Sequence, residues 1–166
     1  MTIAKGDRIP NEALKLVTTE GAREVRANEF FEQGRSILIG IPGAFTPTCS
    51  DNHLPGYLEN RDAILELGVR SIAVVSVNDH FVMSAWARTV DGVDSLAFLA
   101  DGNGEFTRKI GMETDMTAEG LGTRSQRFSM IIEDGVVVTV NTGDAPGQAE
   151  QSGAERILEQ LLSLSC

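Results

Sequence analysis

The chain has 166 residues and a formal net charge of −10, from 14 Lys and Arg against 24 Asp and Glu. Hydrophobic residues make up 42% and charged residues 23%, which is ordinary for a folded protein and excludes wholesale disorder. The acidic balance, with no block of basic residues, argues against nucleic acid and anionic membrane surfaces as partners.

Two buried strands with a helix between them begin the predicted order. Residues 36–41 (SILIGI) are short and apolar, which predicts a strand, and residues 70–77 (RSIAVVSV) predict a second one. Between them, a proline-containing loop precedes apolar positions at helical spacing, which predict a helix over residues 52–67. Gly68 follows as its C-terminal cap.

A second helix and a third strand extend the alternation. Asn78 or Asp79 is expected to cap a helix that runs to about Val90, and residues 95–100 (SLAFLA) predict the third strand. A short helix is expected around residues 104–110. The inner side of the second helix is expected to carry Phe81, Val82, Ala85, Trp86 and Val90.

The last part of the chain predicts a hairpin and a helix. Residues 127–133 and 136–141 flank an Asp-Gly pair, which is a strong hairpin signal between β-rich runs. Ser152 is expected to cap the final helix, with Glu155 completing a capping box. The apolar face expected of that helix consists of Ile157, Leu158, Leu161 and Leu162.

The order of these elements fits one fold class. Strand, helix, strand, helix, strand implies parallel βαβ units, and a hairpin and a terminal helix follow. That is the order of a thioredoxin-like α/β fold, in which helices flank a central mixed sheet. Because the sequence has no repeat, low-complexity tract or linker, residues 1–166 are expected to form a single domain.

The first residues, MTIAKGDRIP, contain neither an apolar h-region nor a small-residue cleavage site, so no signal peptide is expected. The longest apolar runs fall well short of the ~18–20 residues that a membrane span needs. We therefore expect a cytoplasmic protein, where a cysteine is more often free, catalytic or metal-bound than part of a disulfide. The two cysteines and two histidines lack metal-ligand spacing, so no metal site is expected.

The informative stretch is PGAFTPTCS, residues 42–50, which joins the first predicted strand to the helix after it. A cysteine in a first helical turn meets unpaired backbone N–H groups and the positive end of the helix dipole, which favour its thiolate. Three residues before Cys49, the Thr46 hydroxyl can accept one hydrogen bond and donate another. Arg127, at the start of an apolar strand, is the candidate countercharge, because arginine keeps its proton.

Three segments together resemble one known family. They are residues 42–57 (PGAFTPTCSDNHLPGY), residues 76–86 (SVNDHFVMSAW) and residues 127–130 (RFSM). The chain resembles the type-five, atypical subfamily of the peroxiredoxins, with the plant type II enzymes as the nearest variety, over about residues 3–162. The resemblance implies a thiol enzyme that reduces hydrogen peroxide and organic hydroperoxides, without a metal, flavin or haem cofactor.

The resemblance also implies roles for the matching residues. Cys49 matches the peroxidatic cysteine, which attacks the peroxide and becomes a sulfenic acid. Thr46 matches the threonine that holds the peroxide, Arg127 the arginine that polarises thiolate and peroxide, and Pro42 the proline that shields the pocket. The residues expected to bind the peroxide are Gly43, Thr46, Thr48, Cys49 and Arg127.

The fate of the sulfenic acid depends on other thiols. Some family members resolve it with a cysteine before the last helix, where the nearest counterpart here is Ser152. The only other thiol, Cys166, matches no resolving position, although a terminal cysteine could reach another subunit. We therefore expect a one-cysteine cycle with glutaredoxin and glutathione as reductant and thioredoxin as the competitor, in a homodimer like those of the family.

Other interpretations remain open from the residues alone. His53 matches a histidine near the pocket, but it has no assigned role and could be a packed or surface residue. Arg127 could make a structural ion pair, and Thr46 could serve only the turn. A redox sensor or holdase would use the same reactive Cys49 to change partner binding. A non-catalytic thioredoxin-like binding module would leave Cys49 as an unreactive buried thiol.

Overall fold

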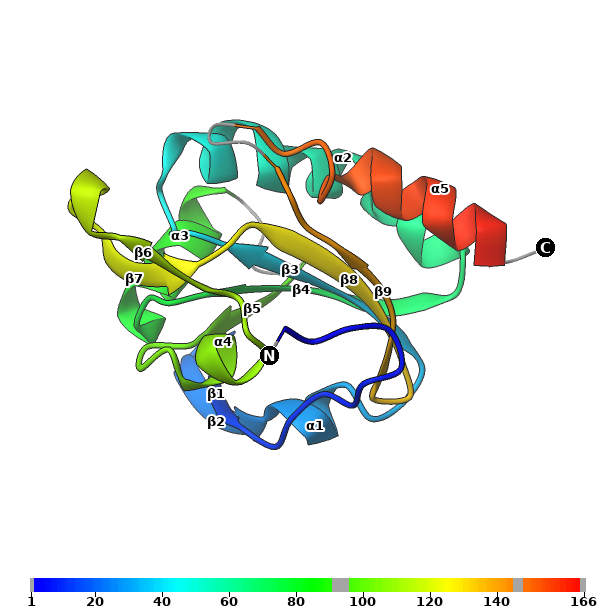
Figure 1. The fold of residues 1–166 in the computed structure, drawn as a ribbon, viewed down its shortest axis with the longest axis horizontal. Helices are drawn as coiled ribbons and strands as arrows, with labels where there is room; N and C mark the ends of the chain where they lie inside the picture. The colour runs from blue at the N-terminus through cyan, green and yellow to red at the C-terminus, as the bar shows by residue number, and fades with distance from the viewer. Residues whose placement is uncertain (1, 91–95, 145–147, 165–166) are drawn as a thin grey trace.

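The computed structural model of the protein describes residues 2–90, 96–144 and 148–164. At its centre lies a seven-stranded sheet with the strand order β2-β1-β5-β4-β3-β8-β9 (Figure 1). The strands of this sheet are β1 (Ala13–Thr18), β2 (Gly21–Arg26), β3 (Arg35–Ile41), β4 (Val69–Ser76), β5 (Ala97–Ala100), β8 (Phe128–Glu133) and β9 (Val136–Asn141). A separate two-stranded sheet is formed by β6 (Glu113–Met116) and β7 (Gly122–Ser125).

The central sheet is mixed and helices flank it, as the sequence predicts for a thioredoxin-like fold. The pairs β3–β4 and β4–β5 are parallel, whereas β8 runs antiparallel to both β3 and β9. Parallel neighbours need crossover connections, and α2 and α3 supply them. The helical elements are α1 (Ala27–Phe30), a π-helix (Cys49–His53), α2 (Leu54–Glu66), α3 (His80–Thr89), α4 (Glu105–Lys109), a 3-10 turn (Thr117–Glu119) and α5 (Ala154–Leu164).

Alternation along β3 divides its side chains between two apolar layers. Ile37, Ile39 and Ile41 face the layer that also contains buried residues of α2, α3 and α5, and Leu38 faces the opposite layer with α1 and α4. Both faces of the strand are covered, so its sequence is continuously apolar rather than alternating. Figure 1 shows α2 and α5 side by side over one face of the sheet.

Several helix predictions are confirmed. Asp79 caps α3 by accepting the Val82 N–H at 2.8 Å, and Gly68 follows α2 with a φ of +86°. Trp86 is fully buried on the inner face of α3. Phe81, however, is 73% exposed, so its predicted inward position is wrong. Five residues of α-helix turn through 500°, which places Phe81 about 140° away from Trp86.

The predicted start and apolar face of the last helix also need correction. Ser152 does not cap α5, because its hydroxyl donates to Asp144, and the helical hydrogen bonds begin with Ile157 N–H to the Gly153 carbonyl. The predicted capping box is therefore absent. Leu162 is 56% exposed, since the narrow face that reaches the sheet is formed by the three buried residues Ala154, Ile157 and Leu161.

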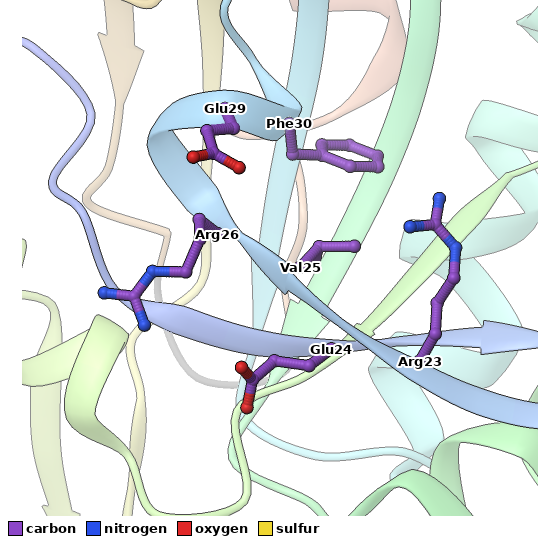
Figure 2. Close-up of a pocket in the computed structure, with 6 residues that line it drawn as sticks. All are labelled: Arg23, Glu24, Val25, Arg26, Glu29 and Phe30. Carbon is purple, nitrogen blue, oxygen red and sulfur yellow. The ribbon is translucent and has the colours of Figure 1, made fainter.

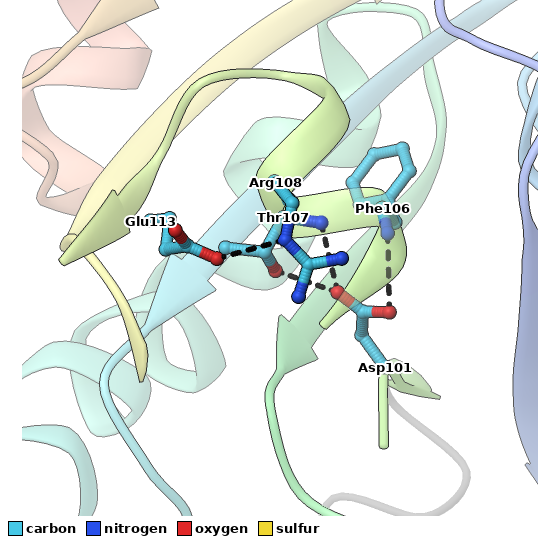
Figure 3. A network of polar contacts seen from close by, with 5 residues as sticks. All are labelled: Asp101, Phe106, Thr107, Arg108 and Glu113. Carbon is cyan, nitrogen blue, oxygen red and sulfur yellow. Dashed lines mark hydrogen bonds and ion pairs between the residues drawn. The ribbon is translucent and has the colours of Figure 1, made fainter. Parts of the chain in front are cut away.

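An aspartate fixes the end of β5 to α4 (Figure 3). Asp101 is buried and accepts hydrogen bonds from Phe106 N–H, Thr107 N–H and the Thr107 hydroxyl. Nearby, Arg108 forms an ion pair with Glu113 at 3.1 Å, which joins α4 to β6. These contacts hold together the segments that follow the carboxyl end of β5.

None of the helices among the described residues has the length and apolar composition that a membrane span requires.

Candidate active site

Cys49 lies where the loop after β3 turns into a helix. The chain becomes helical at Pro47, a residue well suited to a first helical turn because it has no N–H to satisfy. The first helical bond runs from Ser50 N–H to the Thr46 carbonyl at 2.9 Å, so Cys49 is in the first turn, as predicted. From Cys49 to His53 the turn widens to a π-helix, and the Leu54 N–H bonds to the Cys49 carbonyl. Such π-turns occur mostly as single turns and frequently at functional sites.

The Cys49 side chain is fully buried and faces the side chain of Arg127. Arg127 Nη1 donates to Cys49 Sγ at 3.2 Å. The sheet register explains this meeting of residues 78 positions apart: Gly40, near the end of β3, pairs with Phe128, so Arg127 lies at the carboxyl end of β3. The guanidinium therefore places a permanent positive charge beside the sulfur, the countercharge that the sequence predicts for Arg127.

The loop before Cys49 is held by its own hydrogen bonds and by Asn78, which follows β4. The Thr46 hydroxyl donates to the Gly43 carbonyl at 2.7 Å, which commits its hydrogen and leaves its oxygen free to accept. The Ala44 N–H donates to Asn78 Oδ1 at 3.0 Å, and Asn78 also accepts the Ser76 hydroxyl. Asn78 thus anchors the loop instead of capping α3.

Arg124 is a second arginine at this loop, and its contacts here were not predicted from the sequence. Its Nε donates to the Leu121 carbonyl at 2.9 Å and its Nη1 to the Pro42 carbonyl at 3.4 Å. A Cβ at Gly43 would lie only 3.0 Å from the same Nη1, so the guanidinium packs directly over a glycine. Arg124 therefore shapes the loop that carries Pro42 and Gly43. The sequence feature that could have indicated Arg124 is its position three residues before Arg127, in an Arg-x-x-Arg pattern.

His53 lies at the far end of the π-helix from Cys49 and is only 2% exposed. Its Nδ1 is 3.0 Å from Arg127 Nη1, and its Nε2 is 3.0 Å from the Ser152 carbonyl. The pKa of His53 is lowered from 6.5 to about 4, mainly by burial and against the opposing effect of the Ser152 carbonyl; the charge of Arg127 adds to the lowering and that of Asp144 opposes it. The imidazole is therefore neutral at pH 7, and it is a packed residue of the site rather than a surface one.

The structure brings some of the site residues predicted from the sequence into contact and leaves others apart. Cys49, Arg127 and His53 contact one another in the chain of contacts above. Thr46, Gly43 and Pro42 belong to the adjoining loop, and Thr48 is half-buried in the first helical turn. Cys166, the possible second thiol, lies outside the described residues. Ser152 and Asp144, which no motif indicated as site residues, join the cluster through His53.

A surface cavity of about 320 Å³ lies elsewhere, between β2 and α1 (Figure 2). It is lined by Arg23, Glu24, Val25, Arg26, Glu29 and Phe30. In the sheet order, β1, β5 and β4 separate β2 from β3, which leads to Cys49. The lining contains neither a cysteine nor a histidine, so the hollow adds no chemistry to the site.

The chain is similar in sequence and in structure to known proteins. The redoxin family model matches residues 4–158. Peroxiredoxin-2C of Oryza sativa subsp. japonica is 41% identical over 160 residues, which are 96% of this chain and 98% of that protein. The crystal structure of reduced Prx3 from Vibrio vulnificus with hydrogen peroxide superposes with a TM-score of 0.90 at 45% identity, covering 96% of this chain and 99% of that one. The antioxidant protein of Plasmodium falciparum, a 1-Cys peroxiredoxin, gives a TM-score of 0.89 at 27% identity, covering 97% and 99%.

Proposed function

Because this chain belongs to the redoxin family and, with the relatives just described, to the peroxiredoxins, we propose that it is a thiol-dependent peroxidase whose nucleophile is Cys49. The observation that supports this assignment is the contact of Arg127 Nη1 with Cys49 Sγ at 3.2 Å, inside a site where the sulfur is fully buried. An arginine cannot lose its proton, so it is a permanent partner for a thiolate.

The proposed reaction is an in-line displacement on the peroxide. The Cys49 thiolate attacks one oxygen, a sulfur–oxygen bond forms, and the oxygen–oxygen bond breaks. The leaving oxygen takes the electron pair and a proton and departs as water or alcohol, while Cys49 becomes a sulfenic acid. Arg127 can stabilise the charge as it moves from sulfur to oxygen, which lowers the barrier more than it stabilises the bound peroxide.

Thr46 is proposed to orient the peroxide. Its hydroxyl hydrogen is committed to the Gly43 carbonyl, so its oxygen presents lone pairs to a donor. A hydroperoxide O–H is such a donor, and accepting it would hold that hydroxyl oxygen, the one that receives the attack, in line with the sulfur. Pro42, Gly43 and Thr48 are proposed to complete the wall of the pocket, and the Vibrio relative crystallised with hydrogen peroxide supports that substrate.

We propose a one-cysteine cycle in which an external thiol reduces the sulfenic acid. Cys49 is the only cysteine in the described part of the chain, and the loop before α5 carries Ser152 rather than a thiol. The Plasmodium relative, a 1-Cys peroxiredoxin, supports such a cycle. Glutaredoxin with glutathione is the proposed reductant and thioredoxin the alternative. A cytoplasmic homodimer is the proposed state of the protein.

Peroxide consumption by the wild-type chain, Cys49→Ser and Cys166→Ser tests this function. Each is supplied with hydrogen peroxide and either glutaredoxin with glutathione or thioredoxin with its reductase. We expect sustained turnover by the wild type and Cys166→Ser, and none by Cys49→Ser. Loss of turnover in Cys166→Ser, or a Cys49–Cys166 disulfide in the oxidised protein, would refute the one-cysteine cycle. A single oxidation without turnover would instead favour a redox sensor.

A further inference from the structure

An unbroken series of polar contacts runs from the loop before α5 to Cys49. Asp144 accepts the Ser152 hydroxyl, Ser152 contacts His53, His53 contacts Arg127, and Arg127 contacts Cys49. His53 and Ser152 are 99 positions apart in the sequence. We call these four residues behind Cys49, namely Asp144, Ser152, His53 and Arg127, the relay.

Asp144 fixes the backbone of the loop at its end of the relay. Its carboxylate accepts the N–H groups of Glu150 at 2.8 Å, Gln151 at 2.6 Å and Ser152 at 3.1 Å, besides the Ser152 hydroxyl. Desolvation opposes the charge of Asp144, but the hydrogen bond from the Ser152 side chain and the three backbone bonds outweigh it, so the pKa of Asp144 is lowered. The carboxylate therefore sets where the Ser152 carbonyl points.

The Ser152 carbonyl selects one tautomer of His53. It can only accept, so the His53 Nε2 that lies 3.0 Å away must carry the proton. Nδ1 is then the bare nitrogen, and it can accept from Arg127 Nη1 at 3.0 Å. Tyr57 donates its hydroxyl to the same carbonyl at 2.6 Å, which further fixes that oxygen.

We propose that Asp144 and Ser152 are positioning residues of the peroxidatic site, which hold His53 as an acceptor that aims the Arg127 guanidinium at Cys49. This inference rests on the proposed function. The Arg127 guanidinium stands at the end of a long, rotatable side chain. Its Nη1 contacts both His53 Nδ1 and Cys49 Sγ. Removing the His53 acceptor leaves that donor with one fixed partner fewer. Transition-state stabilisation depends on such preorganisation, so a loosened guanidinium costs rate even when the fold is intact.

The test compares two reactions of Cys49 at pH 9, where an ordinary cysteine is mostly thiolate. Iodoacetamide alkylation reports access to the thiolate, whereas the reaction with hydrogen peroxide also needs Arg127 in place. For Asp144→Ala and His53→Ala we expect the peroxide rate constant to fall about 10- to 100-fold, as for loss of one buried charged hydrogen bond. Alkylation should change by less than about 3-fold. His53→Asn, which returns an acceptor near the position of Nδ1, should recover part of the peroxide rate.

Ser36→Ala is the control for an alanine substitution at a buried polar residue outside the relay. Ser36 is a buried serine whose hydroxyl is hydrogen-bonded to that of Ser71 at 3.2 Å, and it lies at the opposite end of β3 from Cys49. Its peroxide rate should equal that of the wild type. A peroxide rate for Asp144→Ala within 2-fold of the wild type would overturn the proposal, and so would an equal fall in peroxide and alkylation rates.

A double-mutant cycle tests whether Asp144 acts through His53. If it does, Asp144→Ala should change the peroxide rate less than 2-fold once His53 is already alanine. Multiplying effects in the double variant would mean that the two residues act separately, and would refute the relay. A wild-type chain that fails to reduce peroxide at all would instead refute the proposed function, which separates the two claims.

Discussion

Replacing His53 by glutamine should flatten the dependence of folding stability on pH. The pKa of His53 is lowered from 6.5 to about 4, first by burial. The unfolded chain therefore takes up a proton near pH 6.5 that the folded chain refuses until about pH 4. The resulting stability is complete above pH 6.5 and is lost as pH falls toward 4, at about 1.4 kcal/mol for each pH unit within this window. Between pH 7.5 and 5 the loss from His53 amounts to about 2 kcal/mol.

The assay is urea unfolding of the reduced protein at pH 7.5, 6 and 5, followed by circular dichroism. Wild-type stability should fall by about 2 kcal/mol more than that of His53→Gln over this range, because glutamine does not titrate. The two chains are compared by how steeply the free energy of unfolding changes with pH, so a uniform destabilisation by the substitution does not affect the result. His80 is present in both chains, and its contribution cancels in the difference.

A parallel loss of stability in the two chains would refute the lowered pKa of His53. If wild type and His53→Gln lose stability in parallel between pH 7.5 and 5, the folded protein protonates His53 as readily as the unfolded chain. The imidazole would then not be the buried neutral acceptor of the relay. A shallower slope for the wild type than for the variant would contradict the sign of the effect, since it requires a raised pKa.

Three further predictions concern the site and its supports. Arg127→Lys should lower the second-order rate constant for hydrogen peroxide about 100- to 1000-fold in stopped-flow measurements, because an ammonium cannot present the guanidinium fork to both sulfur and leaving oxygen; a change under 3-fold would contradict this. Gly40→Ala should lower the melting temperature, at a cost of about 1–3 kcal/mol or more, because its Cβ would lie 1.8 Å from Cε2 of the buried Phe128 ring; an unchanged melting temperature would contradict the close packing. Amide exchange in the π-helix, Cys49–His53, should be faster in the sulfenic form than in the reduced form, because a partner thiol must reach the sulfur; equal protection by mass spectrometry would count against local unwinding.

The parts of the fold that the sequence predicts are those with a strong local pattern. The strands β3, β4, β5, β8 and β9 follow from continuous apolar runs and from an Asp-Gly turn, and the helices α2 and α3 follow from apolar positions at helical spacing. These patterns identify elements without long-range information. The hairpin of β1 and β2 was not predicted, because its half-exposed strands mix charged and apolar residues, as in Gly21–Arg26. Nor was the small sheet of β6 and β7, whose short strands contain few buried residues.

In the candidate site, too, the residues with a local sequence pattern could be predicted and the others could not. Cys49, Thr46 and Arg127 could be found from sequence because two motifs carry them and a thiolate needs a countercharge. The role of His53 could not, since it depends on a carbonyl 99 positions away. Ser152 had a local explanation as a helix cap, and tertiary contacts with Asp144 and His53 replaced it. Long-range hydrogen bonds of this kind leave no local pattern to read.

The proposed peroxidase reaction requires Cys49 to be the residue that peroxide oxidises. The most direct measurement is a peptide map without reductant, after one equivalent of hydrogen peroxide and with a sulfenic-acid trap present. We expect one trapped adduct, on Cys49, and its loss in Arg127→Ala under the same brief exposure. An unmodified Cys49 with the peroxide still in solution would refute the assignment of Cys49 as the nucleophile.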